Sequence, residues 1–191
     1  FRERRESNRP DLPLLSISRE RGVVRQEVLD RKVTSNENKG QYLRICPGDL
    51  GYNTMRMWQG VSALCSLEGI VSPAYTICIP KADMDARFAS YLFRLPSVVH
   101  RFFRYSQGLT SDTWNLKFRH FAEIEVCIPA IDEQRAIAAL LAAVDQEIAL
   151  LKEQRELLAL QKRGLMQKLL TGKWRLGALP PSPGRRSPKG R

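Results

Sequence analysis

One group of residues has the types and spacing of a metal-dependent nuclease site. Asp30 precedes Glu37-Asn38-Lys39, and such a site needs two carboxylates on Mg²⁺ with a lysine near the leaving charge. These residues lie in a polar stretch with loop character, whereas the ligands of such sites are held at strand ends. We therefore interpret them as loop residues and expect no nuclease activity.

The sequence contains no other motif for catalysis or metal binding. A dinucleotide-binding glycine pattern, a Walker loop, a nucleophile elbow and an Asn-Pro-Pro-Tyr-type methylation motif are all missing. The four cysteines, Cys46, Cys65, Cys78 and Cys127, form no CxxC pair, and His100 and His120 add no zinc spacing. We therefore expect no metal, no cofactor and no reaction on this chain, and assign no role to the histidines.

A segment rich in base-reading residue types follows a predicted strand. Residues 48–58 place Asn53, Arg56 and Trp58 at the strand end and in the loop beyond it. Asparagine and arginine bond bidentately to adenine and guanine edges, and tryptophan offers phosphate contact or packing. The alternative interpretation is a strand and turn whose aromatic residues belong to the core. The spacing alone does not separate these two interpretations.

The chain is basic, with a net charge of +11 and a sequence pI near 9.9. This balance favours an anionic partner, most commonly nucleic acid. Six Lys and Arg, with no acidic residue, lie in residues 173–191, so the folded part is only mildly basic. The sequence has no apolar run of membrane-spanning length and no signal peptide, and we expect a cytoplasmic protein with reduced cysteines and no membrane partner.

Short segments of mixed type precede a long helical pattern, which predicts an α+β domain. We expect a solvated arm or truncated remnant at 1–11, a domain at 12–131, a long helix at 132–172 and a disordered basic tail at 173–191. Within the domain, the patterns predict the following elements: a strand within 12–18, a hairpin of 41–46 with 49–53, a strand within 70–79, helices from Asp83 or Asp85 to about 95 and over 97–106, a polar loop at 108–115 and a last strand at 123–128.

The predicted long helix carries a coiled-coil seam. Its apolar residues alternate in steps of four and three, interrupted by two charges, to give Leu141, Val144, Ile148, Leu151, Arg155, Leu158, Lys162, Leu165 and Leu169. At about 1.5 Å per residue the helix would reach roughly 60 Å, more than one small domain can cover. We therefore expect the seam to bind another helix, with Arg155 and Lys162 controlling register or partner choice.

Several segments together resemble the specificity subunit of type I restriction-modification enzymes. The clearest is the junction of Phe121-Ala-Glu-Ile-Glu-Val-Cys-Ile-Pro129 with Glu133-Gln134-Arg135-Ala136-Ile137-Ala138, which is similar to the passage from a target recognition domain into the spacer helix. Further similar segments are Leu15-Ser-Ile-Ser18, Gly22-Val23-Val24, Gly48-Asp-Leu-Gly-Tyr-Asn53, Gly69-Ile-Val-Ser-Pro-Ala-Tyr75 and Lys168-Leu-Leu-Thr-Gly-Lys173. The resemblance spans residues 12–176.

The resemblance implies a non-catalytic reader of double-stranded DNA. In this family the subunit holds methylating subunits, which use S-adenosylmethionine, and restriction subunits, which use ATP and Mg²⁺ and translocate DNA. The usual subunit has two recognition domains and two spacer helices, whereas this chain has one of each, so we expect a fragment or a half-subunit. Two copies pairing through the helix would restore the missing half, and their two-fold symmetry would require an inverted-repeat target.

The residues that we expect to contact DNA are polar or aromatic groups on loops of the domain: Arg19, Arg21, Arg25, Asn53, Arg56, Trp58, Ser111, Thr113, Trp114 and Lys117. The arginines and the lysine would mostly hold phosphates, whereas Asn53, Arg56 and Ser111 are placed to read base edges. The main alternative is an interaction module whose domain binds protein and whose helix forms a coiled-coil dimer without DNA specificity.

Overall fold

The computed structural model describes residues 1–19, 21–28 and 39–176 of the 191-residue chain. It divides into two compact units, Phe1–Leu140 and Leu141–Arg191, which we call the head and the helical unit. The head combines small antiparallel sheets with short helices, and the chain continues into one long helix. The predicted α+β class is therefore confirmed.

Among the described residues, four strands form the central sheet of the head, in the order β1-β8-β5-β6. All neighbours are antiparallel: β1 (Arg2–Arg4) pairs with β8 (Tyr75–Ile79), and β5 (Leu50–Asn53) pairs with both β8 and β6 (Ser62–Leu64). Two separate two-stranded sheets accompany it, β2 (Leu15–Ser18) with β3 (Gly22–Arg25) and β4 (Leu43–Ile45) with β7 (Gly69–Val71).

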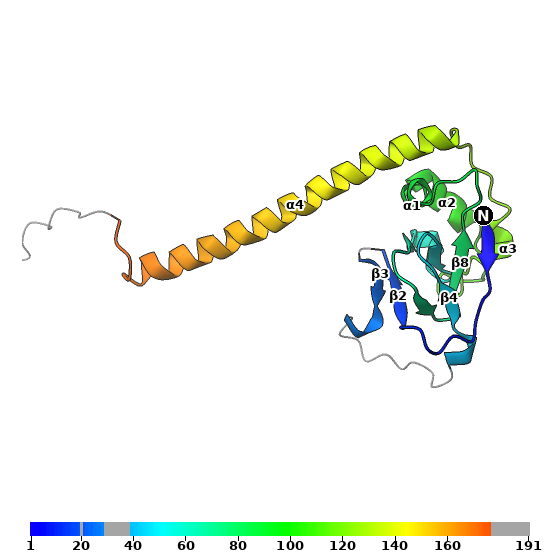
Figure 1. Ribbon diagram of the computed structural model, residues 1–191, viewed down its shortest axis with the longest axis horizontal. Helices are drawn as coiled ribbons and strands as arrows, with labels where there is room; N and C mark the ends of the chain where they lie inside the picture. The colour runs from blue at the N-terminus through cyan, green and yellow to red at the C-terminus, as the bar shows by residue number, and fades with distance from the viewer. Residues whose placement is uncertain (20, 29–38, 177–191) are drawn as a thin grey trace, which may run out of the picture. The chain divides into compact units, whose positions relative to one another are not determined.

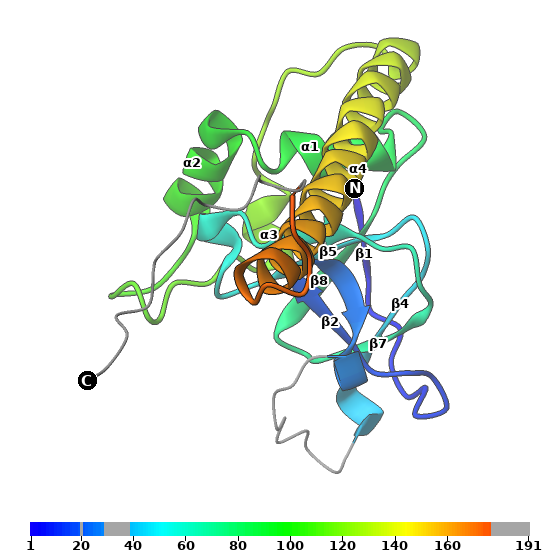
Figure 2. The same ribbon diagram turned by 90° about the vertical axis from the view of Figure 1, so that its left-hand side faces the viewer.

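Side chains alternate between the two faces of the central sheet, and each face is buried in a different cluster. Leu50, Tyr52 and Cys78 contribute to a cluster with the helices, whereas Ile77 packs with the two small sheets. The helices are α1 (Ala86–Leu92), α2 (Pro96–Tyr105) and α3 (Phe118–Phe121). Figures 1 and 2 both show α1 and α2 on one side of β8 and β2 on the other.

Gly51 lets the two layers approach closely. A Cβ atom at this position would lie 2.2 Å from Ile17 Cδ1 and 3.1 Å from Ile45 Cδ1. Both isoleucines are buried in the cluster that packs with the two small sheets, so an added methyl group would force them apart.

The small 3-10 helices of the head are η1 (Gln26–Val28), η2 (Lys39–Gln41) and η3 (Met57–Gln59).

The start of the chain is part of the head, where the sequence predicts a solvated arm. Residues 2–4 form β1, and the Phe1 ring lies 5.6 Å from that of Phe93 and 5.7 Å from that of Phe121. The segment shows no hydrophobic periodicity because it is an edge strand whose charged side chains find partners, such as Arg4 with Asp49. This strand could not be recognised from composition.

Three strand predictions differ from the structure. The predicted hairpin of 41–46 with 49–53 is wrong, because β4 pairs with β7 and β5 with β6 and β8. The single strand predicted within 70–79 is two strands, since Pro73 separates β7 from β8. Residues 123–128 form no strand; Ile124 and Val126 pack against the helical cluster without a ladder. Alternation of apolar and polar residues indicates that one side of a segment is buried, but it does not identify the strand with which the segment pairs.

The helices agree better with the sequence. Asp85 caps α1 by accepting a hydrogen bond from Phe88 N at 2.8 Å, as its position predicts. The long helix α4 spans Ile131–Leu170, so the predicted helix over 132–172 is confirmed. It ends before Gly172, which has a φ of 72°, and Lys168 Nζ lies 4.0 Å from the Trp174 ring. Most of the predicted tail at 173–191 lies outside the described residues.

Candidate nucleic-acid interface

The turn after β5 presents Arg56 to solvent. Asn53 Oδ1 accepts a hydrogen bond from Met55 N at 3.0 Å, and Trp58 Nε1 donates to Met55 O at 3.1 Å. Thr54 Oγ1 fixes the other side of the turn by donating to Ala74 O at 2.9 Å. Asn53 and Trp58 therefore hold the shape of this turn. The Arg56 side chain, one of the predicted base-reading groups, is exposed on the turn and can reach a ligand.

Two predicted residues that are distant in the sequence meet in an aromatic cluster. The Trp58 and Trp114 rings lie edge to face with centroids 5.2 Å apart, and Trp114 also packs on Phe103 of α2 at 4.9 Å. Both tryptophans are partly buried. Their interaction anchors the predicted 108–115 loop beside the turn after β5, so both tryptophans pack within the head, as the alternative interpretation of the 48–58 segment expects for its aromatic residues.

The loop formed by residues 107–115 is closed by its own hydrogen bonds. Gln107 and Asn115 exchange two backbone hydrogen bonds of 2.8 Å. Inside the loop, Thr113 Oγ1 donates to Thr110 O at 2.9 Å and accepts from Thr110 N at 3.1 Å. The Thr113 hydroxyl therefore holds the loop in shape, and Ser111 remains as an exposed hydroxyl at its tip.

Lys117 lies next to the same turn, because Leu116 N donates to Thr54 O at 2.8 Å. A shallow concave surface here is lined by Met55, Asn115 and Lys117, and also by Arg5 and Arg119. The last two are cations that are not among the ten predicted DNA contacts. For Arg119 a signal existed, since it follows Lys117 by two residues. For Arg5 none did, because β1 was not recognised. Glu3 also lines this surface and reduces its positive charge.

The three predicted arginines of the first hairpin form a second group. Arg19 and Arg21 lie in the turn between β2 and β3, and Arg25 ends β3 opposite Leu15. All three side chains are exposed. Among the described residues, no hydrogen bond or ion pair joins this group to the turn after β5 or to the 107–115 loop. The ten predicted DNA contacts thus come from two parts of the head: the first hairpin, and the turn after β5 with residues 111–117.

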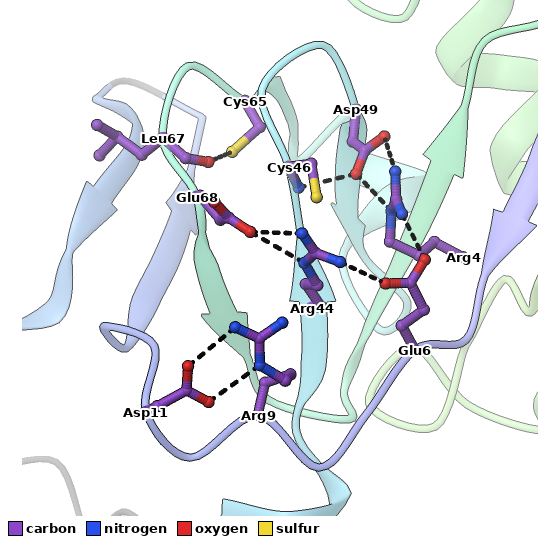
Figure 3. A network of polar contacts seen from close by, with 10 residues as sticks. All are labelled: Arg4, Glu6, Arg9, Asp11, Arg44, Cys46, Asp49, Cys65, Leu67 and Glu68. Atoms are coloured by element: carbon purple, nitrogen blue, oxygen red, sulfur yellow. Dashed lines mark hydrogen bonds and ion pairs between the residues drawn. The ribbon is translucent and has the colours of Figure 1, made fainter.

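Other arginines of the head are already paired with carboxylates (Figure 3). Arg4 donates to Asp49 Oδ2 at 2.8 Å and to Glu6 Oε1 at 2.6 Å, and Arg44 bridges Glu6 and Glu68. Hydrogen bonds from Arg44 and then Arg4 hold the pKa of Glu6 below its usual value. This network joins β1 and β4 to the turn before β5. Because its charges are internally compensated, it contributes little attraction for phosphate.

The buried cysteines are protected from reaction. Burial raises the pKa of Cys65 to about 11 and raises that of Cys78 further, whereas Cys127 is exposed. Only thiolates are alkylated efficiently, and near pH 8 these two groups remain protonated. We expect iodoacetamide to label Cys127 in the folded protein and to reach Cys65 and Cys78 only in urea. Mass spectrometry of the labelled peptides measures this, and rapid labelling of Cys78 without denaturant would contradict the described core.

The described residues hold no group of three His, Cys, Asp or Glu side chains arranged to bind a metal ion. Of the nuclease-like residues, Asp30, Glu37 and Asn38 lie outside the described part of the chain, and Lys39 begins η2. Their arrangement is therefore not described.

The predicted seam of α4 is accessible along the helical unit. Leu141, Val144, Ile148, Leu151, Leu158 and Leu165 are between 38% and 56% exposed, Leu169 is partly buried, and Arg155 and Lys162 are exposed. Leu150, Leu157 and Leu160 lie off the seam and are at least 60% exposed. Apolar side chains on several faces of one helix favour cover by more than one partner element.

No protein-family model and no curated protein matches this sequence at the significance required of a relative. Among the described residues, no helix has both the length and the apolar character needed to cross a bilayer.

Proposed function

We propose that this chain recognises DNA as the specificity subunit, or half-subunit, of a type I restriction-modification complex. The observation that carries the proposal is the meeting of two predicted DNA-reading segments. Contacts between Trp58 and Trp114 and between Leu116 and Thr54 bring the turn after β5 and the 107–115 loop together. Exposed Arg56, Ser111 and Lys117 surround this junction, which supplies groups for both bases and phosphates.

In this role the chain carries out no reaction itself. The chain directs methylating subunits, which carry S-adenosylmethionine, and restriction subunits, which use ATP and Mg²⁺, to a target site. The accessible apolar side chains of α4 support the binding of partner subunits and of a second copy of this chain. A symmetric pair would read an inverted repeat. The free cysteines support a cytoplasmic location, where thiols stay reduced.

A titration of the purified chain against a labelled pool of random-sequence duplexes tests DNA binding. We expect binding that weakens as salt rises, with a slope of about −0.9 in log affinity against log salt for each phosphate contacted. Absence of binding at low ionic strength would contradict DNA recognition and favour the protein-interaction alternative. Co-purification with a methylating subunit tests the second half of the proposal, and failure to form that complex would contradict it.

A further inference from the structure

Leu109 is the most exposed of the large hydrophobic side chains that the structure describes, at 99%. Because it is almost fully exposed, this side chain buries almost no apolar surface within the isolated head. Its neighbours Thr110, Ser111 and Asp112 are polar and exposed. A single exposed leucine thus lies among polar residues of the loop, just before the Thr110–Thr113 turn.

The loop is held in a defined conformation. The paired Gln107 and Asn115 backbones close its base, and the Thr113 hydroxyl ties its tip to Thr110. Gly108 has a φ of 147°, and a Cβ there would lie 2.7 Å from Thr113 O, so a residue with a side chain does not fit. Leu109 is therefore exposed on a loop that its own hydrogen bonds hold in a defined conformation.

The loop lies beside the residues that we propose to contact DNA. Trp114 at its base packs against Trp58, and Lys117 follows it beside the exposed Arg56 turn. Asp112 at the tip would be repelled by phosphates, which disfavours placing the tip along the backbone. A loop with an exposed leucine, hydroxyl groups and one carboxylate is better suited to a groove, where cytosine offers an amino donor.

We propose that Leu109 is a wedge that inserts between stacked bases of the duplex bound by the head. This inference rests on the proposed function and adds a mode of recognition to it. Proteins that bend DNA insert leucine, phenylalanine or methionine between base steps, which unstacks the step and kinks the duplex. Because pyrimidine–purine steps are the easiest to unstack, the wedge would add sequence preference at positions that the other side chains do not contact.

The experiment uses duplexes enriched from the random pool by the full chain, with 2-aminopurine introduced at successive positions. We expect the wild-type chain to increase 2-aminopurine fluorescence several-fold at one step. Leu109→Ala should abolish most of that increase and weaken binding about tenfold, whereas Leu109→Phe should retain both. The melting temperature should be unchanged in both variants, since the side chain touches nothing in the head.

Three results would overturn the wedge. If the chain binds DNA with no fluorescence change at any position and Leu109→Ala binds equally well, the wedge is wrong while DNA recognition stands. If Leu109→Ala leaves DNA binding unchanged but prevents association with a methylating subunit, Leu109 belongs to a protein interface. If the wild-type chain enriches no duplex, DNA recognition itself fails, and the wedge with it.

Discussion

Replacing Gln134 with glutamate is expected to lower the free energy of unfolding of the head by about 3 kcal/mol. The Gln134 side chain is 1% exposed and makes three hydrogen bonds. Its Oε1 accepts from Asp85 N at 2.9 Å, and its Nε2 donates to Asp83 O at 3.0 Å and Pro129 O at 2.9 Å. A carboxylate keeps the first bond and places negative charge against two carbonyl oxygens.

Urea denaturation followed by tryptophan fluorescence measures this loss. Gln161→Glu is the matched control, because it makes the same chemical change at an exposed position of the same helix and should leave the midpoint unchanged. The deficit of Gln134→Glu should shrink as the pH falls, since burial favours the neutral acid, which can donate to one carbonyl. A glutamate variant as stable as wild type at neutral pH would show that Gln134 does not hold the helix start.

The three residues Glu133, Gln134 and Arg135 at the start of α4 differ in their surroundings. Gln134 joins the start of α4 to the segment that caps α1. Arg135 and Glu133 are exposed. Of the three residues, only Gln134 is therefore buried and hydrogen-bonded within the head.

Removing two cations beside the aromatic cluster is expected to weaken DNA binding about 10- to 100-fold at moderate salt. In the double variant Arg56→Ala and Lys117→Ala, two exposed groups near the turn after β5 and the 107–115 loop are lost. If each holds one phosphate, the slope of log affinity against log salt should become shallower by about two. If Arg56 reads a base, the loss should be larger for the preferred duplex than for a scrambled one.

Lys152→Ala with Arg163→Ala provides the control for this measurement. Both side chains are exposed on α4 and are not among the seam residues, and their loss changes the net charge of the chain by the same amount. Fluorescence anisotropy over a salt series should show a nearly unchanged slope for the control. Equal losses in the two double variants would mean that binding follows net charge and that the proposed surface has no special role.

The long helix was predictable because its signal is local. Residues 132–170 lack proline, contain Gly164 alone as a breaker, and repeat apolar positions at helical spacing, so no distant partner is needed to define the helix. The Asp85 cap was equally local. The strands were harder, because pairing depends on segments remote in sequence: nothing in 41–53 indicates that β4 pairs with β7.

The candidate site was predictable as residue types and not as geometry. Arg56 and Ser111 were selected as polar loop residues, and both are exposed. The internal hydrogen bonds of Asn53 and Thr113 require a folded loop and could not be read from spacing. The meeting of Trp58 with Trp114 is likewise a tertiary contact, and Arg5 was missed together with the strand before it.

The most direct measurement of DNA recognition is selection of bound duplexes from a random-sequence library by the purified full chain, followed by sequencing. We expect enrichment of one short motif, bound at least about 1,000-fold more tightly than scrambled competitors at physiological salt. Arg56→Ala should relax the preference at one position of that motif. An unenriched library after repeated rounds, with the folded chain present, would contradict the claim that the head reads DNA.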